Sequence, residues 1–388
     1  MNVLNPIFAA SCLFIALLTA YLFSIKYGKP LIHDKFSSLD GLRGYLAFFV
    51  FLHHSAIWFY YLRSHVWKIP PSNLYTHFGQ SSVAMFFMIT GFLFFSKILD
   101  GKNKIIDWNK LYLSRFFRLT PLYVFSILIL ILICVVLSGP VLNVTYLNLL
   151  SELVHWTFFT IMGAPDLNGV KHTSLIMAGV TWSLAYEWLF YLSLPALALT
   201  VGIKPPKIYI FLSCLALSAL LLHFDIIRTF CFIGGILSAI LVRFDKFRKF
   251  SREPIASLIC ILAIIFTVNM YTTTYDFIPI ILLSLAFSII ACGNTIFGLL
   301  TTDSARFLGE ISYGIYLLQG FVLYITFHFL IGESYSAILS PIWYCVVIMI
   351  CTPILIILSF TTFTFIGCPE FMIETASQFP VFDHADQC

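Results

Sequence analysis

Long apolar runs separated by short, often basic segments dominate the chain. These runs are long enough to cross a bilayer as helices, and none alternates with the period of two that a membrane β-barrel requires. The pattern predicts an all-α polytopic membrane protein with about eleven transmembrane helices. We expect them at residues 6–25, 44–62, 80–97, 119–138, 180–201, 208–224, 229–242, 254–271, 277–299, 308–331 and 341–366.

The distribution of basic residues supports this layout and gives an orientation. With the N-terminus outside, all but four of the 22 lysines and arginines fall on the cytoplasmic side, as the positive-inside rule expects. The exceptions are Arg63, Lys68, Lys171 and Arg228. The apolar segment 146–163 is interpreted as an interfacial or re-entrant helix, because Glu152, His155 and Trp156 suit the headgroup region. Counting it as a crossing would divide the basic residues evenly between the two sides.

The first apolar run is expected to remain in the mature protein. No lysine or arginine precedes it, whereas Lys26 and Lys29 follow it, which is the wrong charge order for a cleaved secretory signal. Residues 6–24 are therefore interpreted as an uncleaved first span. Span parity then places the C-terminus in the cytoplasm.

Composition narrows the class of protein. The 388 residues have a mean hydropathy of +0.96 and only 10% charged residues, against about 25% in soluble domains. The net charge of +4 lies in short loops and does not indicate nucleic-acid binding. The ten cysteines are scattered without a C-x-x-C pair and are interpreted as small apolar residues. No motif indicates ATP hydrolysis, and no histidine–cysteine cluster has metal spacing, so no metal is expected.

The stretch 38–58 carries the strongest candidate chemistry. An ionisable side chain inside a membrane segment is a functional candidate by default, and this stretch has His53 and His54 at mid-span. At about 100° and 1.5 Å per residue, His54 lies within about 20° of the face of Arg43 and roughly 16 Å along the helix. His53 lies about 80° off that face. His54 is interpreted either as a general base or as a histidine hydrogen-bonded across helices. Arg43 is interpreted as a substrate contact or as a membrane-edge cation, with Asp40 as its cap or ion partner.

Two further segments carry charges that suit a buried site. Arg115 and Arg118 are spaced i and i+3 on one helix face, which fits either membrane anchoring or a clamp for phosphate or carboxylate. Glu187 lies about two turns inside a predicted span, where a buried carboxylate needs a partner. We interpret it as part of an ion pair or hydrogen-bond network, with direct catalysis as the alternative. Tyr313 and Tyr316 share a face near Glu310 and are interpreted first as interfacial aromatic residues.

Five blocks in order resemble the acyltransferase-3 family of integral-membrane O-acyltransferases that modify surface polysaccharides, peptidoglycan and some small molecules. They cover roughly residues 37–320. They are Leu39–Gly44 with His54 eleven residues after Arg43, Phe86–Leu93, Arg115-x-x-Arg118 before Pro121 and Tyr123, Trp182–Tyr191, and Leu308–Leu317. Two departures stand out: Gln319 occupies a position where the family commonly has histidine, and Trp188 occupies one where a second glutamate is frequent.

The resemblance implies a ten-span acyltransferase core preceded here by one extra span. We expect three parts: residues 1–35 with the extra span and a cytoplasmic loop, the acyltransferase domain at 36–366, and a short acidic tail at 367–388. It also implies a protein of the bacterial inner (plasma) membrane.

The resemblance further implies transfer of an acyl group, expected to be acetyl, from cytoplasmic acetyl-CoA to a hydroxyl group of a glycan or glycolipid. His54 would act as general base or acyl carrier, Arg43 would orient the donor or stabilise developing charge, and Arg115 and Arg118 would bind CoA phosphates. Glu187 completes the candidate catalytic residues. A succinyl or longer acyl donor stays open. The competing class is a transporter or flippase for an anionic glycan or lipid intermediate, which would use the same buried charges without CoA.

Overall fold

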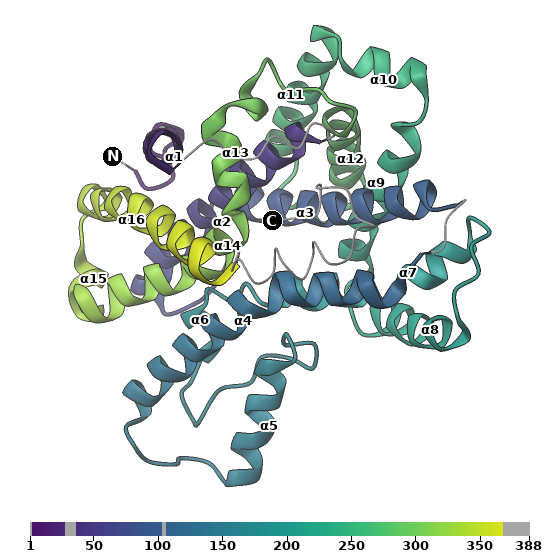
Figure 1. Ribbon diagram of the computed structural model, residues 1–388. Helices are drawn as coiled ribbons and strands as arrows, with labels where there is room; N and C mark the ends of the chain where they lie inside the picture. The colour runs from purple at the N-terminus through teal and green to yellow at the C-terminus, as the bar shows by residue number, and fades with distance from the viewer. Residues whose placement is uncertain (1, 28–35, 103–105, 368–388) are drawn as a thin grey trace.

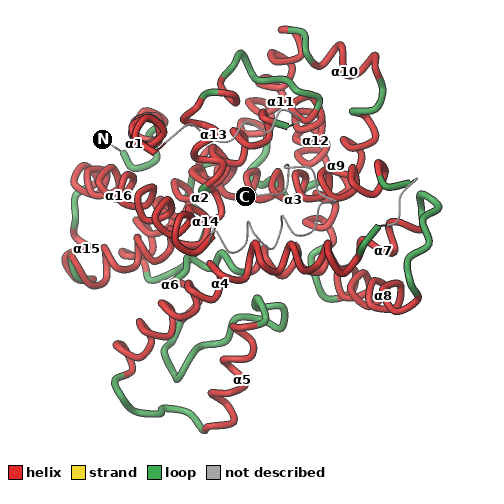
Figure 2. The backbone as a smooth tube through the Cα atoms, viewed as in Figure 1, coloured by secondary structure: helices red, strands yellow, loops and turns green. Residues whose placement is uncertain are grey.

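The computed structural model describes residues 2–27, 36–102 and 106–367, and within these ranges the chain forms helices and no β-strand (Figures 1 and 2). The long helices are α1 (Pro6–Tyr27), α2 (Ser37–Ser64), α3 (Asn73–Asp100), α4 (Trp108–Ser138), α7 (Trp182–Leu199) and α16 (Pro341–Thr362). Shorter ones are α5 (Tyr146–Thr157), α6 (Thr173–Ile176), α8 (Lys207–Leu222), α9 (Ile226–Leu241), α10 (Asp245–Ser251), α11 (Pro254–Met270), α12 (Phe277–Ala291), α13 (Asp303–Glu310), α14 (Ser312–Tyr324) and α15 (Glu333–Ile338). Single turns lie at Leu299–Thr301, Ile325–Leu330 and Phe363–Gly367, and the last two are π-helical.

The fold is that of a helical membrane protein, and each of the eleven predicted segments overlaps a helix. Within the described ranges, six helical segments are long and apolar enough to cross a bilayer: α1, α2, α3, α4, α14 with the π-turn that follows it, and α16 with its own π-turn. The bent pair α9–α10, with an angle of 106°, would make a seventh. Helices α8, α11 and α12 are apolar but shorter. The count of eleven therefore stays a prediction.

Several helix boundaries differ from the predicted ones. Helices α2, α3 and α4 begin 7, 7 and 11 residues earlier than predicted (37 against 44, 73 against 80, 108 against 119), because the polar residues at their starts continue the helix beyond the apolar run. The predicted span 277–299 was too long at its end: α12 stops at Ala291, and Gly293 and Gly298 adopt positive φ, which glycine tolerates without steric cost.

The segment 146–163 forms the 12-residue helix α5, in which Trp156 is the one buried residue. At about 1.5 Å per residue α5 is roughly 18 Å long, which is shorter than a hydrocarbon core of about 30 Å. Figure 1 shows α5 beyond α4, away from the other helices. This geometry favours the prediction that the segment does not cross the bilayer.

Helices α2 and α3 form the centre of the fold and run antiparallel, since Phe36 meets Phe92 at one end and Phe49 stacks on Phe78 near the other. Helices α9 and α12 pack on α3, while α13 and α14 pack on α2. Helices α1 and α16 cover α13 and α14, and α7 pairs with α8 beside α3. Residues 28–35 of the predicted cytoplasmic loop and all of the predicted tail at 367–388 except Gly367 lie outside the described residues.

Two glycines let α2 approach its neighbours closely. A Cβ atom on Gly41 would lie 1.9 Å from the backbone oxygen of Leu300, and one on Gly44 would lie 2.6 Å from that of Ala305. Small residues at such contacts are typical of membrane helix packing. The polar start of α2 is thus held against α13 and the preceding turn, which fixes the position of Arg43.

Candidate active site

Four distant parts of the chain meet α2 at a pocket of about 130 Å³, called here the arginine pocket. Each of the five sequence blocks contributes to its lining: Arg43 from α2, Thr90 and its apolar neighbours from α3, Arg115 and Arg118 from α4, Ser183, Glu187 and Tyr191 from α7, and Tyr313 and Tyr316 from α14. The predicted residues Arg43, Arg115, Arg118 and Glu187 therefore share one site.

The three arginines reach the arginine pocket in different ways. Arg115 is buried, with its guanidinium 5.2 Å from the centre of the Phe94 ring and 3.3 Å from the Ser114 hydroxyl oxygen. Arg118, one turn further along α4, is exposed. Arg43 donates a hydrogen bond of 3.0 Å to Asp40. The predicted ion partner of Arg43 is thus present, although Asp40 lies inside α2 and does not cap it.

Glu187 is half-buried and takes part in a hydrogen-bond network. Its Oε1 accepts hydrogen bonds from the Tyr191 hydroxyl and, at 3.3 Å, from the Thr90 hydroxyl. The Thr90 contact links α7 to α3, while the Tyr191 contact lies within α7. A carboxylate among three arginines offsets part of their mutual repulsion, so the pocket is cationic without being an unrelieved cluster of like charges.

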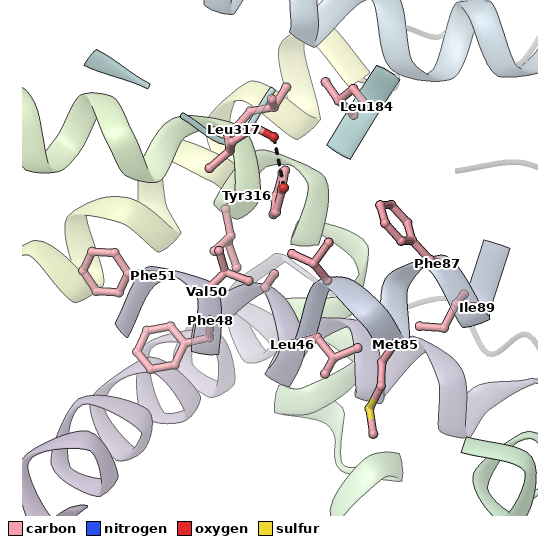
Figure 3. Packing of buried hydrophobic residues seen from close by; sticks show 14 of the residues in the cluster. Leu46, Phe48, Val50, Phe51, Met85, Phe87, Ile89, Leu184, Tyr316 and Leu317 are labelled. Atoms are coloured by element: carbon pink, nitrogen blue, oxygen red, sulfur yellow. Dashed lines mark hydrogen bonds between the residues drawn. The ribbon is translucent and has the colours of Figure 1, made fainter. Parts of the chain in front are cut away.

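The two tyrosines of α14 point inward, whereas the sequence favoured interfacial positions. Tyr313 donates to the Leu119 carbonyl at 3.0 Å. Tyr316 donates to the Val180 carbonyl at 3.1 Å, and its oxygen lies 2.6 Å from the Ser183 hydroxyl. Figure 3 shows Tyr316 among buried apolar side chains, with its hydrogen bond to the Val180 carbonyl drawn as a dashed line. Their spacing of three residues was visible in the sequence, but the facing carbonyl groups were not.

His54 does not line the arginine pocket. It is half-buried and lies further towards the C-terminal end of α2 than Arg43. Its Nδ1 lies 3.4 Å from Gln319 Oε1 of α14, and its ring stacks on Trp67 with 6.3 Å between the ring centres. Since α2 is continuous from Ser37 to Ser64, His54 and Arg43 keep the helical spacing that the sequence predicts. Neither Gln319 as a partner of His54 nor Trp67 was predicted.

His53 has a different environment from His54. It is 7% exposed, and its Nδ1 lies 2.7 Å from the Tyr75 backbone oxygen. A Cβ atom on Gly79 would lie 2.3 Å from the His53 ring, so α3 provides a glycine where the ring packs. These contacts fit a histidine that joins two helices, and they favour His54 over His53 as the reactive imidazole.

A second pocket, of about 180 Å³, lies at the far end of α2 and is called here the aromatic pocket. Its lining includes Trp58, Tyr61 and Tyr324, together with the polar residues Lys171, His172, His328 and Glu333. His328 Nδ1 lies 3.5 Å from Glu333 Oε2. The π-turn Ile325–Leu330 carries His328, and such turns are frequent at functional sites. No pattern in the sequence predicted a site for these residues.

The two pockets lie along the same pair of helices. In the direction of the chain, α2 presents Arg43, His54 and Trp58, while α14 presents Tyr313, Gln319 and Tyr324 beside them. Helices α2 and α14 therefore run parallel, with His54 between the arginine pocket and the aromatic pocket. Among the described residues, no group of three or more His, Cys, Asp and Glu side chains has the arrangement of a metal site.

A helical membrane protein with a pocket of three arginines, a carboxylate and tyrosine hydroxyl groups belongs to the class in which ionisable side chains at membrane depth mark a candidate functional site. Residues 36–360 match the acyltransferase-3 family, whose pattern is described as an acyltransferase domain, and the chain belongs to this family. The resemblance drawn from the five sequence blocks is thus confirmed, and the protein is a membrane acyltransferase. No curated protein and no solved structure matches the chain significantly.

Proposed function

We propose that this protein transfers an acetyl group from cytoplasmic acetyl-CoA to a hydroxyl group of a cell-surface glycan or its lipid-linked precursor. The observation that carries the proposal is the meeting of all five family blocks at the arginine pocket, whose cations suit an anionic donor. Arginine forms bidentate, charge-assisted hydrogen bonds with phosphate. Arg115 and Arg118 would bind CoA phosphates, and Arg43 would orient the thioester or stabilise its developing oxyanion.

His54 would act as the general base. Its imidazole takes the proton of the acceptor hydroxyl group, whose oxygen then attacks the thioester carbonyl carbon. The carbon–sulfur bond breaks, and the leaving CoA sulfur receives the proton from the imidazolium ion. The position of His54 above the arginine pocket supports this role, because a pantetheine arm is long enough to extend from bound phosphates towards mid-span.

The aromatic pocket would receive the acceptor. Trp58, Tyr61 and Tyr324 offer apolar ring faces, and the rim residues offer both hydrogen-bond donors and acceptors, which is the combination that a sugar ring requires. Trp58 lies one turn beyond His54 on α2 and packs edge-on against Trp67, which stacks on His54. The predicted topology places this end of α2 outside, in the bacterial inner membrane, so the donor and acceptor would approach from opposite sides.

The test is transfer of label from radioactive acetyl-CoA to glycan acceptors by the purified protein in nanodiscs. We expect transfer by the wild type and by the control variant His155→Ala on α5, and none by His54→Ala. Label held on the wild-type protein and lost in His54→Ala would make His54 an acyl carrier. No CoA binding and no transfer by folded protein would overturn the proposal in favour of a transporter of anionic glycan or lipid.

A further inference from the structure

Gln319 is the polar group of α14 that faces the candidate base. It is fully buried, in the middle of a helix that is otherwise apolar at that level. Burying an amide is costly unless its hydrogen-bonding groups are satisfied. Both ends of this amide have partners: Nε2 lies 3.1 Å from the Tyr316 backbone oxygen, and Oε1 lies 3.4 Å from His54 Nδ1.

The Tyr316 carbonyl group determines which way the amide points. A backbone carbonyl oxygen only accepts hydrogen bonds, so the group that faces it must be the NH₂ of Gln319. The opposite end, which faces His54, is therefore the amide oxygen, and it too can only accept. The ring nitrogen that meets it must donate, so Nδ1 of His54 carries the hydrogen.

The aromatic contacts of the ring do not change this assignment. His54 also packs against the ring of Trp67 and the ring of His53, whose Nδ1 is bonded to the Tyr75 carbonyl. A neutral imidazole has one donor nitrogen and one acceptor nitrogen, so Nε2 of His54 keeps its lone pair.

We propose that Gln319 is a positioning residue that holds His54 in the tautomer with a hydrogen on Nδ1, so that Nε2 is the atom that removes the proton from the acceptor hydroxyl group. This inference rests on the proposed function of His54. A hydrogen bond at one ring nitrogen fixes the state of the other, as the buried carboxylate does for the histidine of serine proteases. Gln319 performs this role without titrating, because an amide neither gains nor loses a proton in the working pH range.

The difference from the family pattern at position 319 has a chemical consequence. The family commonly has a histidine where this chain has Gln319, and a histidine could relay a proton. A glutamine accepts a hydrogen bond and orients the ring, but it cannot carry the proton further. In this chain the proton taken by His54 therefore returns to the leaving sulfur and does not pass along α14.

The test compares a substitution that removes the acceptor oxygen with one that keeps it. Gln319→Met fills the same space without a strong acceptor, and Gln319→Glu restores an acceptor oxygen. We expect the Met variant to lose about 10–100-fold in kcat, as changes of such orienting partners commonly do, with KM values for both substrates unchanged. The Glu variant should stay within a few-fold of wild type. Gln80→Met is the matched control, because Gln80 on α3 accepts its hydrogen bonds from Thr273 and Thr274 and not from His54.

The outcomes test the positioning role of Gln319 and the proposed function of His54 separately. Full kcat in Gln319→Met, or equal losses in the Met and Glu variants, overturns the positioning role. Transfer by His54→Ala, assayed in parallel, overturns the proposed function itself. Should the Met variant fail to fold, ¹⁵N spectra of histidine-labelled wild-type protein, assigned by difference from His54→Ala, give the answer directly. A hydrogen on Nδ1 supports the proposal, and a hydrogen on Nε2 of the neutral ring overturns it.

Discussion

The arginine pocket and the aromatic pocket are built on the same two parallel helices, yet they differ in chemistry. The first gathers three arginines from α2 and α4 around one carboxylate. The second combines aromatic rings with histidines, a lysine and a glutamate. A fixed cationic pocket suits a polyanion such as CoA, whereas rings with mixed polar groups suit a neutral, hydroxyl-bearing molecule. Under the proposed function, this difference divides the site by substrate, with the donor in the arginine pocket, the acceptor in the aromatic pocket and His54 between them.

The largest effect on acyl transfer is expected when His54, which lies between the two pockets, is replaced. His54→Ala should lower acyl transfer by about 10²–10⁴-fold, the usual contribution of a general base, while acyl-CoA affinity stays at the wild-type value because His54 does not line the arginine pocket. Equilibrium binding of acyl-CoA beside the transfer assay measures both quantities. A parallel loss of acyl-CoA affinity would place His54 within the donor site and would contradict its position between two separate pockets.

The next effect belongs to the donor side. Arg115→Ala removes a buried cation from the arginine pocket, and a hydrogen bond to a charged group contributes about 1.5–3 kcal/mol. The KM for acyl-CoA should rise by about 10–100-fold, with the acceptor KM unchanged and partial recovery in Arg115→Lys. Arg248→Ala on α10, an exposed residue paired with Asp245, is the control. An equal rise of both KM values would argue for a structural role of Arg115.

A smaller effect is expected on the acceptor side. Tyr61→Ala and Lys171→Ala alter the lining of the aromatic pocket, where Tyr61 is half-buried and Lys171 is exposed. An exposed charged contact such as one from Lys171 contributes about 1 kcal/mol or less. The acceptor KM should rise a few-fold in each variant while the acyl-CoA KM is unchanged. Lys68→Ala replaces another exposed lysine that lies outside the aromatic pocket. An equal rise of the acceptor KM in Lys68→Ala and Lys171→Ala would contradict the assignment of the acceptor to the aromatic pocket.

The smallest effect needs no substitution. Salt screens interactions between exposed charges, with a Debye length of about 10 Å at 0.1 M and 3 Å at 1 M. Raising the ionic strength should therefore raise the KM for acyl-CoA modestly, through the exposed Arg118, and leave the acceptor KM nearly constant. Steady-state kinetics over a salt series measures this, and a greater salt dependence of the acceptor KM would reverse the two assignments.

Much of the donor site could be predicted from the sequence because its residues stand out locally. Arg115 and Arg118 are conspicuous at i and i+3, Glu187 is a carboxylate in an apolar run, and His54 returns to the face of Arg43 through helical geometry alone. The aromatic pocket had no such signal. Tyr61, Tyr324 and Glu333 are ordinary residues for helix ends near a membrane surface, so only their meeting distinguishes them.

Residue order alone was enough to predict the helical membrane fold, the family and the candidate charges, because apolar run length and residue spacing within one helix are local properties. Helix packing was needed to show which charges share a pocket, that His54 lies apart from them, and that Gln319 faces His54 although 265 positions separate the two in the chain. Those relations depend on how helices distant in sequence pack. Close contacts such as Gly41 against Leu300 and Gly79 against His53 set that packing. The residues around each glycine in the sequence do not show which distant residue it contacts.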